Sequence, residues 1–196
     1  MINGEQQLYQ YKINNKQMKK ILILTITLFS LSISAQGINW MSFEEAVKAQ
    51  KVTPKKIFVD AYTVWCGPCK LLDKNTFSNP DLIAYMNEYY YAVKFNAEGN
   101  ETVNFKGKKY TNPGFNPNSN GRNSAHELSG FFGIRAYPTL LFLDEKADFI
   151  TPLPGYRTPT QLELYLKMFE KDDHKKLNSQ EKFNEYTTNF KYEFKE

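Results

Sequence analysis

The only two cysteines of this 196-residue chain, Cys66 and Cys69, lie within the run Trp65-Cys66-Gly67-Pro68-Cys69-Lys70. A short apolar run ending at Asp60 precedes them, and helix signals begin at Cys66. A thiolate at a helix N-terminus is stabilised by the helix dipole and by unpaired backbone N–H groups, so it ionises nearer to neutral pH. A second thiol one turn away can displace any mixed disulfide that the first one forms. The spacing therefore predicts redox chemistry.

Paired cysteines also bind metals, but this chain offers few further ligands. His126 and His174 are its only histidines, and neither falls in a cluster with the spacing of metal ligands. We therefore predict no metal site, and we expect both histidines to be solvated. No glycine-rich phosphate cradle and no Ser/His/Asp arrangement stands out, so we expect no cofactor besides a redox-active Cys66–Cys69 disulfide. Thiol-based delivery of copper(I) is a further alternative.

The N-terminal segment has the pattern of an export signal. Lys19 and Lys20 precede an apolar run over residues 21–33, which the small residues Ser34 and Ala35 follow. This pattern predicts a cleavable signal peptide over residues 18–35, because the run is too short to span a bilayer comfortably. The residues before Met18, 1–17, read as an upstream extension. An uncleaved membrane anchor is the alternative.

The positive net charge belongs mostly to that segment. The whole chain carries a formal charge of +4, but residues 1–36 hold four lysines and one glutamate, so the remainder carries +1. We therefore expect no nucleic-acid partner and no polybasic membrane patch. A disulfide that closes so short a loop stabilises weakly, so reactivity explains the cysteine pair better than structural cross-linking does.

Short β-branched and aromatic runs alternate with helix signals along the rest of the chain. Ser42 and Glu45 form a capping box at a helix start, and Thr158-Pro159 starts the last clear helix. The expected strands cover residues 56–62, 90–96, 139–143 and 148–150, with helices starting near residues 43, 66, 80 and 159. This alternation predicts an α/β sandwich.

Two stretches do not fit a minimal domain. Residues 99–123 are rich in Gly, Asn and Pro and are interpreted as a long loop, which is uncommon unless functional or disordered. Residues 171–196 are highly charged but carry apolar residues at roughly helical intervals, so we expect a C-terminal helix or a loosely docked tail.

From Phe43 to Phe169 the chain resembles the thioredoxin family. The hexapeptide around the cysteines matches the active-site loop of that family letter for letter, and Asp60 lies six residues before the first cysteine. Lys94, the run Tyr137-Pro138-Thr139 and Gly155 also fall where the family has matching residues. The resemblance implies a thioredoxin fold over residues 37–170, with a central mixed sheet flanked by helices and a long insertion, 99–123, before the cis-proline strand.

The resemblance also implies roles for four residues in catalysis. Cys66, at the exposed helix start, is the attacking thiolate, and Cys69, more buried, is the resolving thiol. Asp60 is a buried carboxylate with a raised pKa that takes the proton of Cys69 through a water. Lys94 holds this aspartate partly ionised. The alternatives are a strand-end Asp60 that bonds a backbone amide and a plain surface Lys94.

A second group of residues would bind the substrate. The resemblance implies a cis bond between Tyr137 and Pro138, with the backbone before the proline pairing with an extended substrate. Trp65 offers a flat apolar surface beside Cys66, although a bulky aromatic can equally belong to the core. Gly67 and Pro68 complete the loop, and Pro68 keeps its turn rigid.

These features together predict a thiol–disulfide oxidoreductase that is exported to the periplasm and exchanges electrons with protein disulfides or thiols. The Gly67-Pro68 pair resembles reducing members of the family, which favours a reductase or isomerase over a strong oxidase. Having no third cysteine, the chain needs a separate redox partner, which we expect to be membrane-bound, and we expect a monomer. The alternative is a chaperone-like binding module that uses residues 99–123, with the cysteine pair secondary.

Overall fold

The computed structural model describes residues 11–12 and 37–195. The predicted signal peptide, 18–35, and the predicted extension, 1–17 apart from residues 11–12, lie outside the described residues. Of the helices that the structure describes, none is both long and apolar enough to cross a bilayer. The segment from Gly37 to the C-terminus forms one compact unit that contains both cysteines.

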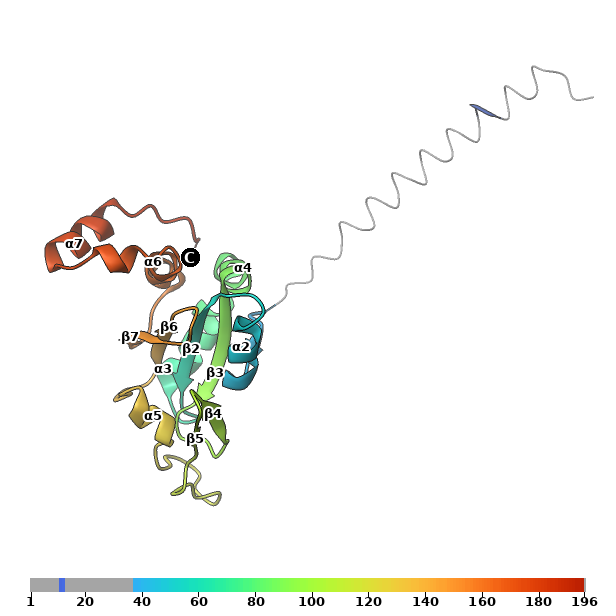
Figure 1. Cartoon of the computed structure of the whole chain (residues 1–196), viewed down its shortest axis with the longest axis vertical. Helices are drawn as coiled ribbons and strands as arrows, with labels where there is room; N and C mark the ends of the chain where they lie inside the picture. Colours follow the sequence, from blue (N-terminus) through green and yellow to red (C-terminus); the bar gives the residue numbers. More distant parts are fainter. Residues whose placement is uncertain (1–10, 13–36, 196) are drawn as a thin grey trace, which may run out of the picture. The chain divides into compact units, whose positions relative to one another are not determined.

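A five-stranded mixed sheet forms the centre of this unit (Figure 1), with the strand order β1-β3-β2-β6-β7. Strands β1, β2 and β3 are parallel to one another, whereas β6 runs antiparallel to β2, and β7 to β6. The strands cover Trp40–Met41 (β1), Lys56–Tyr62 (β2), Tyr90–Asn96 (β3), Thr139–Leu143 (β6) and Phe149–Pro154 (β7). The mixed central sheet predicted from the sequence is confirmed.

Helices cover both faces of the sheet, because side chains of a strand alternate between the faces. Ile57, Val59 and Ala61 of β2 pack in one apolar cluster, and Phe58 packs in the other. The first cluster is covered by α2 and α5, and the second by the helical segment α3-η1 together with α4 and α6. These elements cover Phe43–Gln50 (α2), Gly67–Leu71 (α3), Leu72–Thr76 (η1, a π-helix), Pro80–Tyr89 (α4), Glu127–Phe131 (α5) and Pro159–Glu170 (α6).

The helix starts follow from local sequence. The Ser42 side chain accepts a hydrogen bond from the Glu45 N–H, and the Glu45 carboxylate accepts one from the Ser42 N–H. Thr158 and Gln161 form the equivalent capping box at α6. Such caps satisfy N–H groups that have no partner within the helix.

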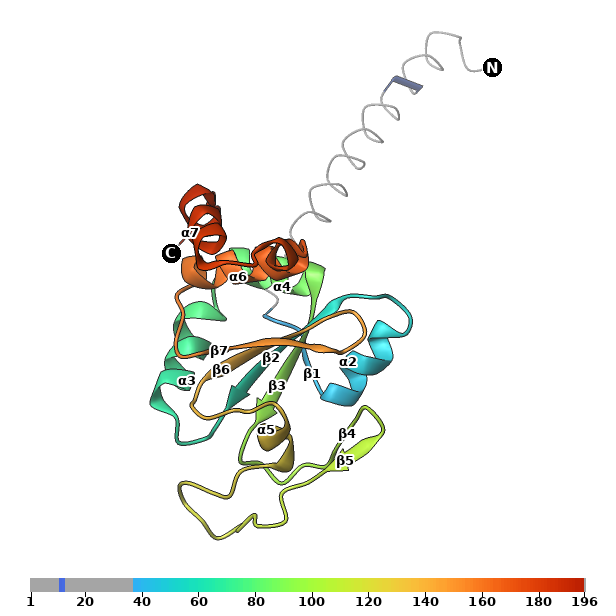
Figure 2. The same ribbon diagram turned by 60° about the vertical axis from the view of Figure 1, so that its left-hand side comes forward.

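Residues 99–123 are not the plain loop expected from their composition. They contain the two-stranded hairpin β4 (Val103–Phe105) and β5 (Lys108–Tyr110). The Phe105 ring is buried, with its centroid 5.6 Å from that of Phe43 and 5.6 Å from that of Phe132. The insertion therefore extends the core through a few aromatic side chains that its polar composition concealed. Figure 2 shows the hairpin beside α5, at the opposite end of the domain from α7.

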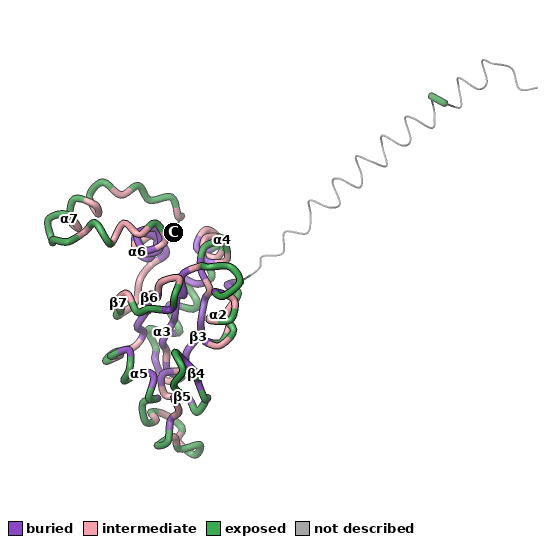
Figure 3. The backbone as a smooth tube through the Cα atoms, in the orientation of Figure 1, coloured by how far each residue is buried: buried purple, intermediate pink, exposed green. Residues whose placement is uncertain are grey.

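The C-terminal region folds back onto the domain and docks there. A 3₁₀ turn (η2, Asp173–Lys176) and α7 (Gln180–Asn189) follow α6. The backbone N–H groups of Glu193 and Phe194 both donate to the carboxylate of Glu163, which is fully buried on α6. The tail is therefore fixed by hydrogen bonds, although α7 itself buries no residue fully and is largely green in Figure 3.

The expectation of two solvated histidines is wrong. His126 is 1% exposed and caps α5, because its Nδ1 accepts a hydrogen bond from the Leu128 N–H. His174 is half-buried, with its ring centroid 5.1 Å from that of Phe169. Burial is the main cause that lowers the pKa of His174. His126 therefore caps α5, and His174 packs against Phe169.

Candidate active site

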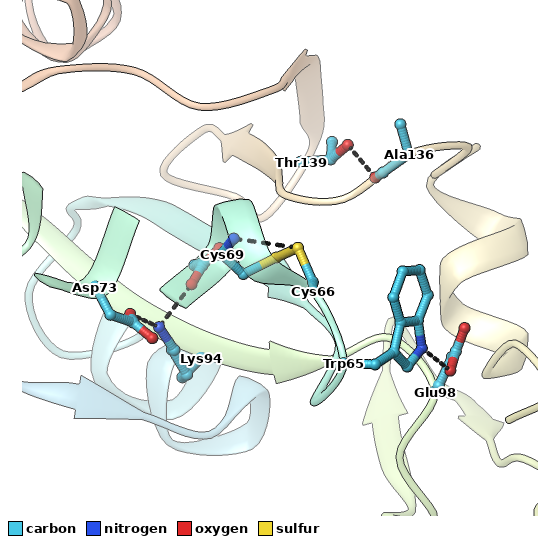
Figure 4. The surroundings of a disulfide bond; sticks show 9 residues. Trp65, Cys66, Cys69, Asp73, Lys94, Glu98, Ala136 and Thr139 are labelled. Carbon is cyan, nitrogen blue, oxygen red and sulfur yellow. Dashed lines mark hydrogen bonds and ion pairs between the residues drawn. A yellow bond between two sulfur atoms is a disulfide. The ribbon is translucent and has the colours of Figure 1, made fainter. Parts of the chain in front are cut away.

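The two cysteines are joined by a disulfide at the start of α3 (Figure 4). Cys66 is the N-cap of this helix, and its Sγ accepts a hydrogen bond of 3.1 Å from the Cys69 N–H. The Cα atoms are 5.3 Å apart, as expected for residues on one helical turn. Because α3 continues directly into η1, the sulfur of Cys66 lies at the N-terminal end of a helical segment that runs to Thr76.

Both cysteines are buried, which differs from the expectation of an exposed Cys66. Each is 2% exposed in the disulfide form. The reason is local, since Cys66 Sγ turns inward to bond Cys69 and to accept its N–H. Gly67 and Pro68, the residues between them, are exposed. A partner would therefore approach the disulfide over this exposed turn.

Asp60 and Lys94 meet behind the cysteine turn. They are register partners on β2 and β3, and Asp60 Oδ2 lies 2.7 Å from Lys94 Nζ. Asp60 shares the sheet face of Phe58, which α3-η1 covers, so the carboxylate lies beneath the helix that carries Cys69. Asp60 is fully buried, and neither carboxylate oxygen has a hydrogen-bond partner of regular geometry among the described residues.

Lys94 is held by a second carboxylate and by three aromatic rings. Its Nζ also pairs with Asp73 of η1, and Cys69 lies one turn before Asp73 in the same helical segment. The Nζ atom lies 4.9 Å from the ring of Trp40, 5.2 Å from Tyr62 and 5.1 Å from Phe77. Cation–π contacts and ion pairs thus fix the lysine, which is not a free surface residue.

These surroundings shift the pKa of Asp60 in the direction expected from the sequence. Burial raises the pKa of Asp60 to about 6, Lys94 opposes the rise, and Asp73 adds to it. For Lys94, burial alone lowers the pKa, but Asp60 and Asp73 outweigh it, and the net effect is a raised pKa. At neutral pH Asp60 is poised close to its own titration, as a proton acceptor should be.

Figure 4 shows Trp65, predicted to bind substrate, on the other side of the disulfide from Asp73 and Lys94, with Ala136 and Thr139 above the disulfide. The Tyr137–Pro138 peptide bond is cis, and the Tyr137 ring meets the Trp65 ring edge-on, with centroids 5.8 Å apart. Pro138 is buried and Tyr137 half-buried. The Thr139 hydroxyl donates to the Ala136 carbonyl, which closes the loop around the proline.

Trp65 is tied to residues that the sequence did not reveal. Its Nε1–H donates to Glu98 Oε2 at 2.7 Å, and the guanidinium carbon of Arg122 lies 4.4 Å from the centre of its ring. The indole is half-buried, so it is neither a bare apolar platform nor a core residue. Asp73, Glu98 and Arg122 were all missed, and only the position of Asp73 one turn after Cys69 was a usable signal.

No candidate metal centre emerges from the part of the chain that the structure describes. Over residues 11–12 and 37–195, no group of three or more His, Cys, Asp or Glu side chains is placed to hold an ion. The acidic residues beside the disulfide, Asp60 and Asp73, are instead paired with Lys94.

Comparison with known proteins decides the family. A family model described as a thioredoxin-like domain matches residues 43–170. The chain belongs to the thioredoxin-like family. A member whose Cys-x-x-Cys pair closes a disulfide at a helix start is a thiol–disulfide oxidoreductase, so this protein is an enzyme of that class.

Several solved structures are similar to this chain. A thioredoxin-fold protein from Helicobacter pylori is 18% identical, with a TM-score of 0.53, over 69% of this chain and 81% of that protein. The DsbH oxidoreductase is 14% identical, with a TM-score of 0.51, over 72% and 89% of the two chains. These two show the fold. A candidate disulphide-isomerase from Bacteroides thetaiotaomicron is 31% identical over 70% and 93%, with a TM-score of 0.47. Comparison with curated proteins gave no match.

Proposed function

We propose that this thioredoxin-like protein is an exported reductase of protein disulfides. The observation that carries the proposal is the Cys66–Cys69 disulfide, with the buried Asp60–Lys94 pair beneath the helix of Cys69. On reduction, the Cys69 N–H that now contacts Cys66 Sγ can stabilise a Cys66 thiolate. Asp60, with its pKa raised to about 6, is the base for Cys69.

The reaction proceeds in two exchanges. The Cys66 thiolate attacks one sulfur of a substrate disulfide, the Cys66–substrate bond forms, and the released substrate thiolate takes a proton from solvent. Cys69 then passes its proton to Asp60 and attacks Cys66 Sγ. The Cys66–Cys69 bond forms as the Cys66–substrate bond breaks, and the second substrate sulfur leaves as a thiolate that takes a proton from solvent, to which Asp60 returns its own proton. The substrate gains the electron pair that the enzyme loses.

Proteins are the substrates that suit this site. Two exposed apolar side chains, Val64 (60% exposed) and Leu71 (51% exposed), flank the cysteine turn in sequence. Exposed apolar residues around a reactive group favour contact with another protein. The backbone at the cis Tyr137–Pro138 bond provides a place for an extended segment, by strand addition. Such a segment would present its disulfide to Cys66.

A separate redox partner must reset the enzyme, because the sequence contains no third cysteine to relay electrons. We propose a membrane-bound dithiol protein in this role, since the signal-peptide pattern over residues 18–35 directs the chain to the periplasm of a two-membrane bacterium. We further propose that the enzyme acts as a monomer, which light scattering would test. Cell fractionation and the N-terminal sequence of the processed protein would test export.

Insulin reduction and the reduction potential together test the proposal. We expect wild type to accelerate insulin reduction by dithiothreitol, and Cys66→Ser and Cys69→Ser to abolish turnover. Activity that survives both substitutions would favour the chaperone-like alternative. We expect the Cys66–Cys69 couple to equilibrate with glutathione near the thioredoxin value of about −270 mV, whereas about −120 mV would indicate an oxidase. Refolding of scrambled ribonuclease would reveal isomerase activity, which the description of the 31%-identical Bacteroides relative suggests.

A further inference from the structure

The insertion places a positive charge on the tryptophan beside the attacking cysteine. The guanidinium carbon of Arg122 lies 4.4 Å from the centre of the Trp65 ring, and Trp65 directly precedes Cys66. Arg122 is exposed, and within residues 37–195 its guanidinium forms no ion pair. A guanidinium that stacks on an aromatic face keeps its in-plane N–H donors free for a planar carboxylate. Arg122 therefore presents unused hydrogen-bond donors beside the active site.

The position of Arg122 is fixed by its neighbours. Glu98 Oε2 accepts hydrogen bonds of 2.7 Å from both the Trp65 Nε1–H and the Asn123 backbone N–H. One carboxylate oxygen thus joins the tryptophan to the residue after Arg122. The Asn123 side chain also exchanges two hydrogen bonds of 2.8 Å with the backbone of Asn116. Asn123, the neighbour of Arg122, is therefore held beside Trp65 by bonds to Glu98 and to Asn116.

The base of the insertion is equally well anchored. Asn112 is 8% exposed, and its side-chain N–H groups donate to the carbonyls of Gly99 and Ser124, at opposite ends of the segment. Its carbonyl oxygen accepts a bond of 2.7 Å from the Ser124 hydroxyl. With Phe105 of the hairpin in the core, the whole insertion is an integral part of the domain. The backbone that carries Arg122 therefore has a fixed position in the domain.

The charges on the two sides of the disulfide differ. Beneath Cys69, two carboxylates share Lys94. Beside Cys66, the carboxylate of Glu98 is occupied by two N–H donors, and Arg122 has no carboxylate of its own. Lys70 and Arg135, both exposed, add positive charge near the motif and the cis-proline loop in sequence. An anionic group that approaches over Trp65 would meet guanidinium donors of Arg122 that no carboxylate of the described residues engages.

We propose that Arg122 is a substrate-recognition residue, which selects protein disulfides that have an Asp or Glu side chain next to the cysteine. This inference rests on the proposed function, since it concerns which disulfides the same Cys66–Cys69 pair reduces. A carboxylate of the substrate accepts charge-assisted hydrogen bonds from the free edge of the guanidinium while the backbone lies along the cis-proline loop. The exchange chemistry itself is unchanged.

Two disulfide peptides that differ at one position test the proposal. One carries Glu beside its cysteine and the other Gln, and the readout is the ratio of their kcat/KM values for reduction by the full domain at low salt. We expect wild type to prefer the Glu peptide about threefold to fivefold, as for a partly exposed ion pair. This preference should fall toward one at 0.5 M salt, because mobile ions screen exposed charges.

Variants then assign the preference to one residue. We expect a ratio near one for Arg122→Gln and below one for Arg122→Glu. Lys109→Gln is the matched control, because Lys109 is an exposed cation of the same insertion and should keep the wild-type ratio. An equal loss of preference in Lys109→Gln, or no preference in wild type, would overturn the proposal. If wild type reduced neither peptide, the proposed function would fall as well. A wild-type preference that does not change with salt would overturn the proposal even if an Arg122 variant does not fold.

Discussion

Asp60 and Lys94 face each other as register partners on the parallel strands β2 and β3, and a distance of 2.7 Å separates Asp60 Oδ2 from Lys94 Nζ. The carboxylate is fully buried, whereas the lysine reaches toward Asp73 at the surface of η1. The ionised form of a buried acid is poorly stabilised when its positive partner is shared with a second acid. This arrangement keeps the proton affinity of Asp60 high, as its proposed role as the base for Cys69 requires.

The first prediction concerns stability against pH. Burial raises the pKa of Asp60 to about 6, above its unfolded value of about 4. The stabilisation from protonated Asp60 is therefore complete below about pH 4 and is lost as the pH rises through about 6. Asp60→Asn mimics the neutral acid, so its free energy of unfolding should exceed that of wild type by up to about 3 kcal/mol at pH 8.

Urea unfolding at pH 4.5, 6 and 8 checks this prediction. The advantage of Asp60→Asn should shrink toward pH 4.5, while Asp148→Asn, at an exposed carboxylate, should show no such trend. The same Asp60→Asn variant should slow insulin reduction roughly 10- to 100-fold, because Cys69 loses its base. A stability difference that is constant with pH would contradict the assigned role of Asp60.

The second prediction concerns the partner of this carboxylate. Lys94→Met removes the charge but leaves an apolar chain among the rings of Trp40, Tyr62 and Phe77. At pH 8 it should destabilise wild type by about 2 to 4 kcal/mol, because the Asp60 anion remains buried without its cation. In the Asp60→Asn background, Lys94→Met should lower the free energy of unfolding by much less. Equal costs in a double-mutant cycle would show that the two residues are not coupled.

The third prediction concerns the orientation of Trp65. Glu98→Ala removes the acceptor of both the indole N–H and the Asn123 N–H. Trp65 should become more accessible, which acrylamide quenching in a Trp40→Phe background would report. The kcat/KM for protein disulfides should fall roughly tenfold, because the surface beside Cys66 is displaced. Glu181→Ala on α7 is the control, and an identical loss there would point to a general charge effect.

The fourth prediction concerns the C-terminal tail. Phe194 packs against Tyr85, with ring centroids 5.8 Å apart, and its backbone N–H bonds Glu163. Phe194→Ala should lower the free energy of unfolding by about 1 to 2 kcal/mol, since the ring is only partly buried. Insulin reduction by Phe194→Ala at 25 °C should be unaffected. Lys191→Ala is the control, and its free energy of unfolding should equal that of wild type. Loss of activity without loss of stability would indicate a role for the tail in recognition.

The elements that sequence reasoning placed well are those with dense local signals. The continuous β-branched and aromatic runs at residues 56–62 and 90–96 coincide with β2 and β3. The capping box at Ser42 and the Thr158-Pro159 pair mark helix starts. The strands β4 and β5 were missed because each is only three residues long and they lie among Gly, Asn and Pro. Their stability comes from tertiary contacts such as that of Phe105 with Phe43.

The candidate site likewise contains residues that the sequence predicted and residues that it did not. The cysteine turn follows from spacing, and the Asp60–Lys94 pair follows from the family resemblance. The contacts of Trp65 with Glu98 and Arg122 could not be anticipated, because they join segments that are distant in sequence and depend on how the insertion folds. The equal burial of Cys66 and Cys69 was also not anticipated, because it depends on how Cys66 Sγ turns toward Cys69 in the disulfide form.

Trapping of the mixed disulfide tests the central claim most directly. Reduced Cys66→Ser and Cys69→Ser variants are incubated with a protein disulfide, and covalent adducts are measured by non-reducing electrophoresis and mass spectrometry. We predict that Cys69→Ser accumulates an adduct through Cys66 that dithiothreitol releases, and that Cys66→Ser forms little or none. Adducts of equal yield in both variants, or an adduct through Cys69 alone, would contradict the assignment of Cys66 as the attacking thiol.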